Sequence, residues 1–314
     1  MKVCDCNNTL ANQGTGCTPL FHVAAKLIAV PTYDSTGARN GIDLTDTLNE
    51  AYFTALINEA DATKRWYPLP EMKNVSSPRA DAIVSEWEDG TTEFVRQGSK
   101  SFAAVIPSNN ANPMILGQLE SIRCGEVSVY VIDNKGSLRG SLSSDGATLY
   151  PIRIDSPSFS ANLQDATGST NQRMDIKFSF HPDEQDADLR MITADELGGS
   201  YLLAVKGLIE VTMVFSSLAT TGVVVKMKTP FGTQLNPVLK KGLLVANFIS
   251  SVGAATSKAR NVTDGSDISI TSVTEDSTGG TYTLAWTAQT SADVVAILAT
   301  ATGYHFTATT FVTP

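Results

Sequence analysis

The cleanest alternation of apolar and polar side chains lies between Gln172 and Phe180, and it predicts a β-strand. One face is apolar and the other is polar, with Met174, Ile176, Phe178 and Phe180 set against Arg173, Asp175, Lys177 and Ser179. Successive side chains of a strand point to opposite faces of a sheet. We therefore expect this segment to form an antiparallel strand whose apolar face covers a core.

Less regular apolar runs predict further strands in the first two thirds of the chain. They lie at residues 21–30, 80–87, 91–96, 99–106, 127–132, 149–154 and 157–163. Apolar residues at helical spacing predict one helix over residues 47–60 and a short second helix that begins at Pro113.

The composition changes after about Tyr201, where small and β-branched residues dominate and helical spacing fades. Short strands are predicted there at 208–216, 222–228, 242–249, 268–273, 281–287 and 294–301. That rhythm is typical of an immunoglobulin-like (Ig-like) sandwich. The sequence thus predicts a mainly β protein with a few helices (α+β). A β-barrel or sandwich domain with an N-terminal arm occupies 1–215, and an Ig-like domain occupies 216–314.

Composition and charge narrow the class of protein. Of the 314 residues, 42% are hydrophobic and 18% are charged, as in globular rather than disordered chains. The formal net charge of -9 excludes a nucleic-acid-binding surface that covers the whole protein. Residues 1–215 hold 17 basic and 27 acidic residues, whereas residues 216–314 hold 6 and 5.

The chain has no apolar run near the roughly 20 residues that span a membrane, so no membrane partner is expected. The first residues are polar where a secretory signal would be apolar. This pattern favours synthesis and folding in a cytoplasm.

Residues suited to catalysis are sparse. The three histidines, His22, His181 and His305, are far apart in the sequence. No zinc-protease helix, phosphate-binding loop, dinucleotide fingerprint or serine-hydrolase elbow occurs in it. We therefore expect neither an enzyme nor a bound cofactor. The acidic run at 183–188 lacks the spacing of a calcium loop and is interpreted as a solvated helix start or loop.

Three of the four cysteines lie near the N-terminus, where Cys4, Cys6 and Cys17 with His22 make up a chemically permitted zinc set. The Cys-x-Cys spacing argues against a zinc site, because roughly two to four residues usually separate paired ligands. Reduced thiols in a reducing compartment are the alternative. Cys124 is expected to be a small buried residue.

A hairpin turn is predicted directly after the strand-like residues 127–132. It consists of Asp133, Asn134, Lys135 and Gly136, and glycine tolerates the positive φ that such turns need. Exposed hairpins and strand edges pair with other chains. We therefore assign these four residues a role in self-assembly.

Three stretches of the chain resemble virion structural proteins of tailed bacteriophages. They are residues 87–102 (WEDGTTEFVRQGSKSF), 116–123 (LGQLESIR) and 127–132 (VSVYVI) with its hairpin. The order of parts is most similar to that of a major tail tube protein, with barrel strands, a packing helix, a long hairpin and an Ig-like module. The tube-like part of the resemblance covers residues 18–215.

That resemblance implies a protein without catalysis that forms hexameric rings. The rings would stack into a tail tube through which DNA passes, and other tail proteins would be further partners. It also implies a location in the virion tail after assembly in the bacterial host cytoplasm. The inner wall of such a tube should be neutral or acidic, because lysine and arginine would bind the passing phosphates. The acidic excess in residues 1–215 suits that role.

Other interpretations stay open. A capsid decoration protein or a head–tail connector could also carry an Ig-like module. A carbohydrate-binding, adhesin-like module would need exposed aromatic residues on one sandwich face, and the candidates are Tyr282, Trp286, Tyr304 and Phe306. Tyr282 and Trp286 have the same strand parity, which favours a place in the core for both.

Overall fold

The chain is described by a computed structural model over residues 20–111, 113–233, 237–249, 258–306 and 309–314. The described residues up to Gly207 form one compact unit, and those from Leu208 onward form a second. Strands dominate in both units, which confirms the prediction of a mainly β protein with a few helices. None of the helices in these described ranges is long and apolar enough to span a membrane.

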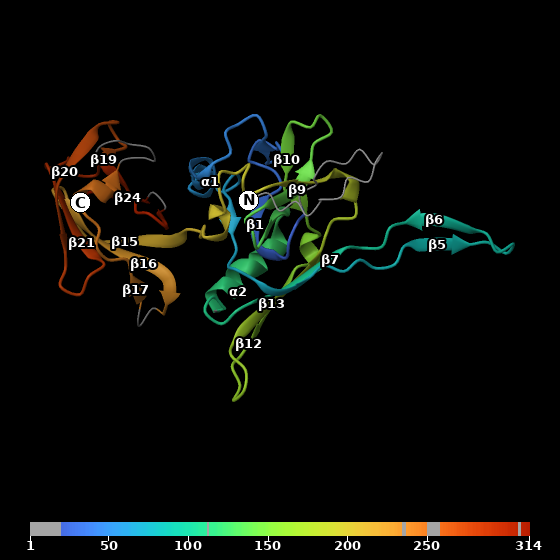
Figure 1. Ribbon diagram of the computed structural model, residues 1–314. Coiled ribbons are helices and arrows are strands. Elements are labelled where there is room, and N and C mark those ends of the chain that lie inside the picture. Colours follow the sequence, from blue (N-terminus) through green and yellow to red (C-terminus); the bar gives the residue numbers. More distant parts are fainter. Residues whose placement is uncertain (1–19, 112, 234–236, 250–257, 307–308) are drawn as a thin grey trace. The chain divides into compact units, whose positions relative to one another are not determined.

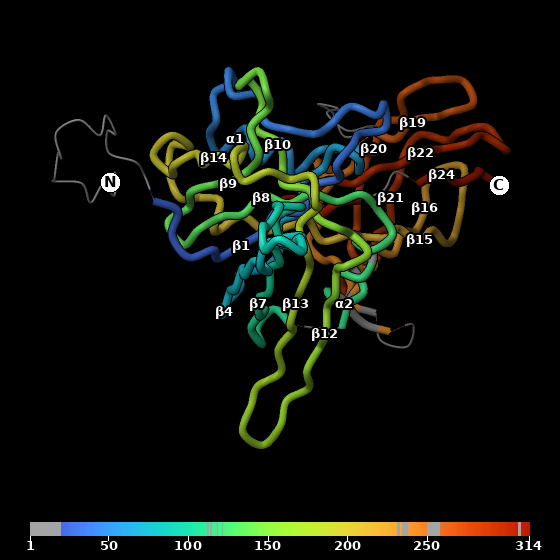
Figure 2. The backbone as a smooth tube through the Cα atoms, turned by 90° about the vertical axis from the view of Figure 1, so that its right-hand side faces the viewer, coloured from blue at the N-terminus to red at the C-terminus, as the bar shows by residue number. Residues whose placement is uncertain are grey.

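The first unit contains two sheets and a separate two-stranded hairpin (Figure 1; Figure 2). The larger sheet has the order β2-β10-β9-β8-β1-β3, with β11 joined to β8 and β14 joined to β9. Its strands are β1 (Ala24–Pro31), β2 (Ile42–Asp43), β3 (Tyr67–Pro68), β8 (Val127–Asp133), β9 (Leu138–Leu142), β10 (Thr148–Tyr150), β11 (Ile152–Arg153) and β14 (Leu189–Ile192). The smaller sheet has the order β12-β13-β7-β4, with β4 (Lys73–Ser76), β7 (Ser101–Ile106), β12 (Ser160–Gln164) and β13 (Arg173–Ser179). The hairpin pairs β5 (Ile83–Glu86) with β6 (Thr92–Arg96).

The main core of the first unit joins residues of the two sheets. Alternate apolar residues of β1, β8, β7 and β13 meet there, including Leu27, Ala29, Val129, Val131, Phe102, Ala104, Ile106, Met174, Ile176 and Phe178. The alternation predicted for residues 172–180 is confirmed, because β13 buries its apolar face and exposes Arg173 and Lys177. This strand pairs antiparallel with β12 on one side and with β7 on the other.

The other face of the larger sheet is covered by α1 (Glu50–Ile57) and by aromatic side chains. The Asn49 side chain caps this helix by accepting a hydrogen bond from the backbone N of Tyr52. The Phe53 ring meets Trp66 edge-on at 5.5 Å, and Trp66 stacks on Tyr130 of β8 at 4.7 Å. The helix is shorter than the predicted span of 47–60, because Asn49 caps its start and Asn58 ends it.

The second helix, α2 (Pro113–Glu120), confirms the short helix predicted from Pro113 and continues into η1 (Ser121–Cys124). Leu119 is buried in the main core, and Ile122 packs against it. Cys124 is exposed, so the prediction that it is buried is wrong. The reason is local, since Ile122 rather than Cys124 contacts the core from this turn. The remaining short helices of the unit are η2 (Ser156–Ser158), η3 (Asp186–Asp188) within the acidic run, and η4 (Tyr201–Leu203).

Lys26 is a buried cation in β1. Its Nζ donates to the carbonyl oxygen of Leu203 at 3.0 Å and also to that of Val205. Burial lowers the pKa of Lys26 to about 8, although Glu71 acts in the opposite direction. The first strand of the unit thereby holds the unit's last turn, η4, in place.

The described strands of the second unit form one ten-stranded hydrogen-bonded network. Eight of them follow the order β18-β22-β19-β20-β21-β16-β15-β23, while β17 is joined to β16 and β24 to β22. The first part of β20 pairs with β19 and the last part with β21, and the register is irregular between Ile270 and Ser272. Such a bulge lets one strand pass between packed layers. An Ig-like arrangement of the unit stays a prediction. Its elements are β15 (Ile209–Ala219), β16 (Gly222–Gly232), β17 (Pro237–Leu239), η5 (Val245–Asn247), β18 (Phe248–Ile249), β19 (Lys258–Asn261), β20 (Asp267–Glu275), β21 (Thr281–Trp286), β22 (Val294–Ala299), β23 (Tyr304–Phe306) and β24 (Thr309–Val312).

The core of the second unit takes up the aromatic residues that an adhesin-like module would expose. Tyr282, Trp286 and Phe306 are buried, and Tyr304 packs against the same core. This confirms that Tyr282 and Trp286 are core residues. The Tyr282 hydroxyl is satisfied there, because it donates to the carbonyl oxygen of Lys240 at 2.9 Å.

The division between the two units precedes the boundary expected at 215/216. That position falls inside β15, whose Val211 and Met213 already belong to the core of the second unit. β15 also pairs with β16 on both sides of residue 215. The change in composition therefore falls within β15, whereas the two compact units meet in the sequence at Gly207 and Leu208, just before β15 begins.

Candidate assembly surface

The projecting hairpin, defined as residues 79–100, leaves the sheets of the first unit between β4 and β7 (Figure 1). Val84 of β5 lies opposite Phe94 of β6 in the antiparallel pair. Its turn follows from the local sequence, because Gly90 takes a φ of 81° and the Asp89 carboxylate accepts from Thr91. The bonds come from the Thr91 backbone N at 2.9 Å and from its Oγ1 at 2.6 Å. They lower the pKa of Asp89 and fix a tight turn.

The strands of the projecting hairpin have no core of their own. Every residue from 76 to 97 is exposed, including the large apolar side chains of Ile83, Val84, Trp87, Phe94 and Val95. Trp87 and Phe94 each expose 58% of their surface. An isolated two-stranded hairpin is marginally stable in water, and clustered exposed apolar residues mark interaction sites. The projecting hairpin thus has the properties of a surface that another molecule covers.

The projecting hairpin has an acidic tip and a mainly basic root. The tip, residues 84–95, carries Glu86, Glu88, Asp89 and Glu93 and no basic residue. The root, residues 79–83 and 96–100, carries Arg79, Asp81, Arg96 and Lys100. All the negative charge of the tip is therefore concentrated around Trp87, and the basic residues lie at the other end.

A groove of about 580 Å³ lies at this root. The root groove is lined on one side by the root and on the other by residues 180–182, 184–187 and 189, together with Ile152. Its apolar lining consists of Ile83, Ile152, Phe180 and Leu189, with smaller contributions from Ala80 and Ala187. It therefore combines apolar surface with the basic residues of the root.

Two carboxylates of the root groove are each shared by two cations. Asp186 lies 3.3 Å from Lys100 Nζ and also pairs with Arg79. Burial acts to raise the pKa of Asp186, but Lys100 and Arg79 hold it below its usual value.

The second shared carboxylate is Glu184. Its Oε1 lies 2.9 Å from Arg153 Nε and 3.4 Å from an Arg39 nitrogen. Arg39 and Arg153 flank the groove rather than line it, and Arg153 also lies 3.6 Å from Asp183. The root groove and these flanking residues together hold five basic and four acidic side chains, so the region has a net charge of only +1.

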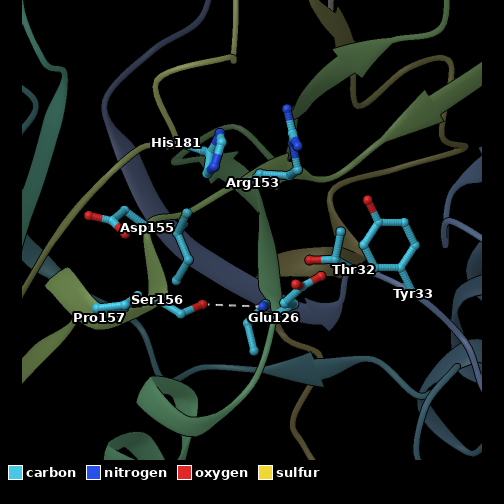
Figure 3. Close-up of a pocket in the computed structure, with 10 residues that line it drawn as sticks. Thr32, Tyr33, Glu126, Arg153, Asp155, Ser156, Pro157 and His181 are labelled. Carbon is cyan, nitrogen blue, oxygen red and sulfur yellow. Dashed lines mark hydrogen bonds between the residues drawn. The ribbon is translucent and has the colours of Figure 1, made fainter.

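A second pocket, of about 270 Å³, is polar and is shown in Figure 3. Ser156 Oγ accepts a hydrogen bond from the Val127 backbone N at 3.4 Å, drawn as the dashed line. His181 also lines the pocket, and its Nδ1 lies 3.5 Å from a carboxylate oxygen of Asp183. Ser156 and His181 are not hydrogen-bonded to each other in the described chain.

The hairpin turn predicted from sequence is present between β8 and β9. The buried Asp133 carboxylate accepts from the backbone N of Lys135 at 2.9 Å, of Ser137 at 2.8 Å and of His22 at 3.0 Å. Gly136 has a φ of 89°, as predicted for its place in the turn.

The surroundings of this turn cover two of its four residues. A Cβ atom on Gly136 would lie only 2.6 Å from the Ser200 Cα, so the turn packs against its own chain. Asn134 and Lys135 are its exposed residues, whereas Asp133 and Gly136 are buried. The assembly role of the four residues stays a prediction.

Sequence reasoning identified β5 and β6 as strands but did not single out the projecting hairpin as a surface. A signal was available in residues 83–95. Val84 and Phe94 lie on one face of the hairpin, while Trp87 has the opposite parity, so apolar residues occur on both faces. Such a two-sided pattern beside an acidic turn has no single core-facing side.

The zinc hypothesis involves residues that fall mostly outside the described ranges. Cys4, Cys6 and Cys17 lie there, and only His22 is described. Within the described residues, no group of three or more histidine, cysteine, aspartate or glutamate side chains is arranged to hold a metal ion.

Comparisons with known proteins do not assign the chain to a family. No family model and no curated protein sequence matches the chain. One similar solved structure is a chain of the anti-feeding prophage (AFP) baseplate, determined by cryo-EM with 6-fold symmetrisation. It has 12% sequence identity and a TM-score of 0.24, and the match covers 57% of this chain and 98% of that chain. A TM-score this low does not establish a common fold.

Proposed function

We propose that this chain is a structural protein of a phage-like particle and that it assembles with copies of itself through the projecting hairpin. The observation that carries the proposal is the apolar, coreless hairpin with Trp87 and Phe94 exposed in solvent. When a neighbouring subunit covers this exposed apolar area, the free energy of association becomes more favourable by roughly 25 cal/mol for each Å² buried. The particle class comes from the resemblance to tail proteins of residues 87–102, which include this hairpin.

The finer proposal is that the subunits form hexameric rings that stack into a tail tube for passing DNA. The strongly acidic balance of residues 1–215 supports it, because an acidic or neutral wall does not hold phosphates. In this role the protein acts by assembly and not by catalysis. Its partners are copies of itself and other tail proteins, within the virion.

The direct test is the association state of the purified full-length chain. We expect light scattering to show association with rising concentration, and negative-stain microscopy to show rings or tubes. Rings with a channel that retain no double-stranded DNA in filter binding at moderate salt would support the tube. A chain that stays monomeric at high concentration would overturn the proposal, and tight DNA capture would favour a connector instead.

A matched pair of variants separates the projecting hairpin from exposed apolar residues in general. Phe94→Ser removes an exposed apolar side chain from the hairpin, and Leu244→Ser removes one from the second unit, where Leu244 is 70% exposed. We expect the first variant to require at least a tenfold higher concentration to assemble and the second to behave like the wild type. Equal effects of the two substitutions would contradict a specific role for the hairpin.

A further inference from the structure

We propose that the tip of the projecting hairpin binds in the root groove of a second copy of this chain. This inference rests on the proposed function and identifies the surface that the hairpin contacts. It makes a definite statement about geometry, namely that two different parts of the same hairpin meet across each subunit contact.

The apolar parts of the tip and the root groove match. Trp87 stands in solvent at the tip, next to the turn at Asp89 and Gly90. The root groove offers the apolar side chain of Ile83, which is 43% exposed, and that of half-buried Leu189. Ile152 and Phe180 also line it, although they expose only 3% and 6% of their surface. Its volume of about 580 Å³ is within the range of pockets that enclose whole ligands, so an indole and its neighbours fit. A tryptophan seated in such a pocket is a typical centre of binding energy in an interface.

The charges of the two parts are also complementary. The tip presents four carboxylates and no cation around Trp87. In the root groove, Asp186 is shared by Arg79 and Lys100. Glu184 is shared by Arg39 and Arg153, which flank the groove, and Arg153 also pairs with Asp183, so the region around the groove has a small net positive charge. Among the described residues Arg96 forms no ion pair, and neither does Asp81 at the same root. Opposite charges of this kind steer two surfaces together and fix their register.

The occupant of the groove must come from another copy. Tip and root are opposite ends of one extended ribbon, and the tip lies far from the sheets (Figure 1). Arg79 and Asp89 are ten residues apart, which is up to about 33 Å in extended chain at roughly 3.3 Å per residue. The tip therefore cannot reach its own root groove while the hairpin is formed.

A contact between tip and root groove has a consequence for symmetry. It joins two unlike surfaces, so each copy retains a free tip or a free groove until the assembly closes. Such heterologous contacts form rings when the rotation closes and filaments when it does not, and they do not stop at a two-fold dimer. This agrees with the ring-forming role proposed above.

The test uses one variant for each side of the contact in the full-length chain. Trp87→Ser disables the tip, and Ala187→Trp fills the root groove from an exposed position. Ala62→Trp is the matched control, because Ala62 is exposed in the same unit but outside the groove. We expect each of the first two variants to need at least a tenfold higher concentration to assemble, and the control to assemble normally. Circular dichroism of all three should match the wild type.

Mixing the two disabled variants gives the decisive result. The Ala187→Trp chain retains a tip and the Trp87→Ser chain retains a groove, so they should form a one-to-one complex that grows no further. A photoreactive benzoyl-phenylalanine at position 87 should cross-link to residues 79–83, 96–100 or 180–189 of a second copy.

The outcomes distinguish this inference from the proposed function. If the wild type assembles but the mixed variants stay monomeric, or position 87 cross-links elsewhere, the tip-to-groove contact is wrong and the proposed function stands. If the wild type itself never assembles, both are overturned.

Discussion

The projecting hairpin and the β8–β9 hairpin use the same local chemistry in opposite surroundings. Each turns at an aspartate whose carboxylate accepts a hydrogen bond from the backbone N two residues later, and each has a glycine at positive φ. Asp133 and Gly136 are buried against their own chain, whereas Asp89 and Gly90 stand in solvent. Turn chemistry thus specifies that a hairpin forms, and the residues on its two faces decide whether it belongs to the core or to an interface.

The largest expected difference in the free energy of unfolding is between a phenylalanine of the main core and one of the projecting hairpin. Phe178 of β13 is buried in the main core and Phe94 lies on the projecting hairpin. Phe178→Ala should lower the free energy of unfolding by about 3–5 kcal/mol, because it removes a packed ring. Phe94→Ala should change it by less than about 0.5 kcal/mol, as other exposed substitutions do. Urea unfolding below the assembly concentration measures both, and a large effect of Phe94→Ala would place that ring in a core.

The next effect concerns the aspartate of the β8–β9 turn. Asp133→Ala should lower the free energy of unfolding by about 2–4 kcal/mol, since three backbone N–H groups lose their acceptor inside the protein. Lys135→Ala in the same turn is exposed and should have almost no effect. Chemical denaturation of both variants makes the comparison, and equal values would show that the carboxylate does not support the turn.

A pair of glycine substitutions sharpens the contrast further. Gly136→Ala should cost about 2–3 kcal/mol, because strain at positive φ adds to a clash with the Ser200 backbone. Gly90→Ala has the same backbone strain but meets nothing within 4 Å, and we expect about 1 kcal/mol, confined to the hairpin. Hydrogen exchange of the β5–β6 amides and global unfolding separate the two. A global loss from Gly90→Ala would show that the projecting hairpin folds with the core.

The smallest expected effect is the pH response of the exposed turn. The pKa of Asp89 is held below its ordinary value by bonds from Thr91. A carboxyl group whose folded pKa is depressed adds stability above its unfolded pKa and loses it as the pH falls through the folded pKa. The hairpin should therefore loosen below about pH 4. Thr91→Val should raise the pKa of Asp89 in an NMR titration and Thr91→Ser should preserve it; identical curves would contradict the bond.

The pattern of apolar and polar residues predicted where strands lie better than it predicted which strands pair. The alternation of residues 172–180 identified β13 because this strand lies half-buried between two others. The strand predicted at 127–132 is β8, which extends by one residue to Asp133. The pairing of β13 with β7 and of β8 with β1 joins distant parts of the chain, so no local pattern shows it. For the same reason, Asp133 to Gly136 could be predicted as a turn but not as one covered by Ser200.

The exposure of the projecting hairpin could not be predicted from local sequence either. Residues 80–87 and 91–96 are predicted as strands that flank an Asp-Gly turn, and the structure has strands at 83–86 and 92–96. Whether such strands pack on a sheet depends on what the rest of the chain places beneath them. Among the described residues, none buries the side chains of these two strands. The root groove depends on Phe180 and Ile152 being brought to the hairpin by two other parts of the fold.

The hydrogen bonds of the buried Lys26 ammonium have a consequence for folding during translation. The carbonyl groups of Leu203 and Val205 that hold its ammonium lie 177 and 179 residues later in the chain. At roughly 5–20 residues per second, a ribosome needs about 9–36 s to deliver them. During that time β3 and β8, the strand partners of β1, are made first, and the Lys26 ammonium is the group of β1 that still lacks its acceptors. The first unit is therefore completed only near the end of its own translation, when its last turn closes over its first strand.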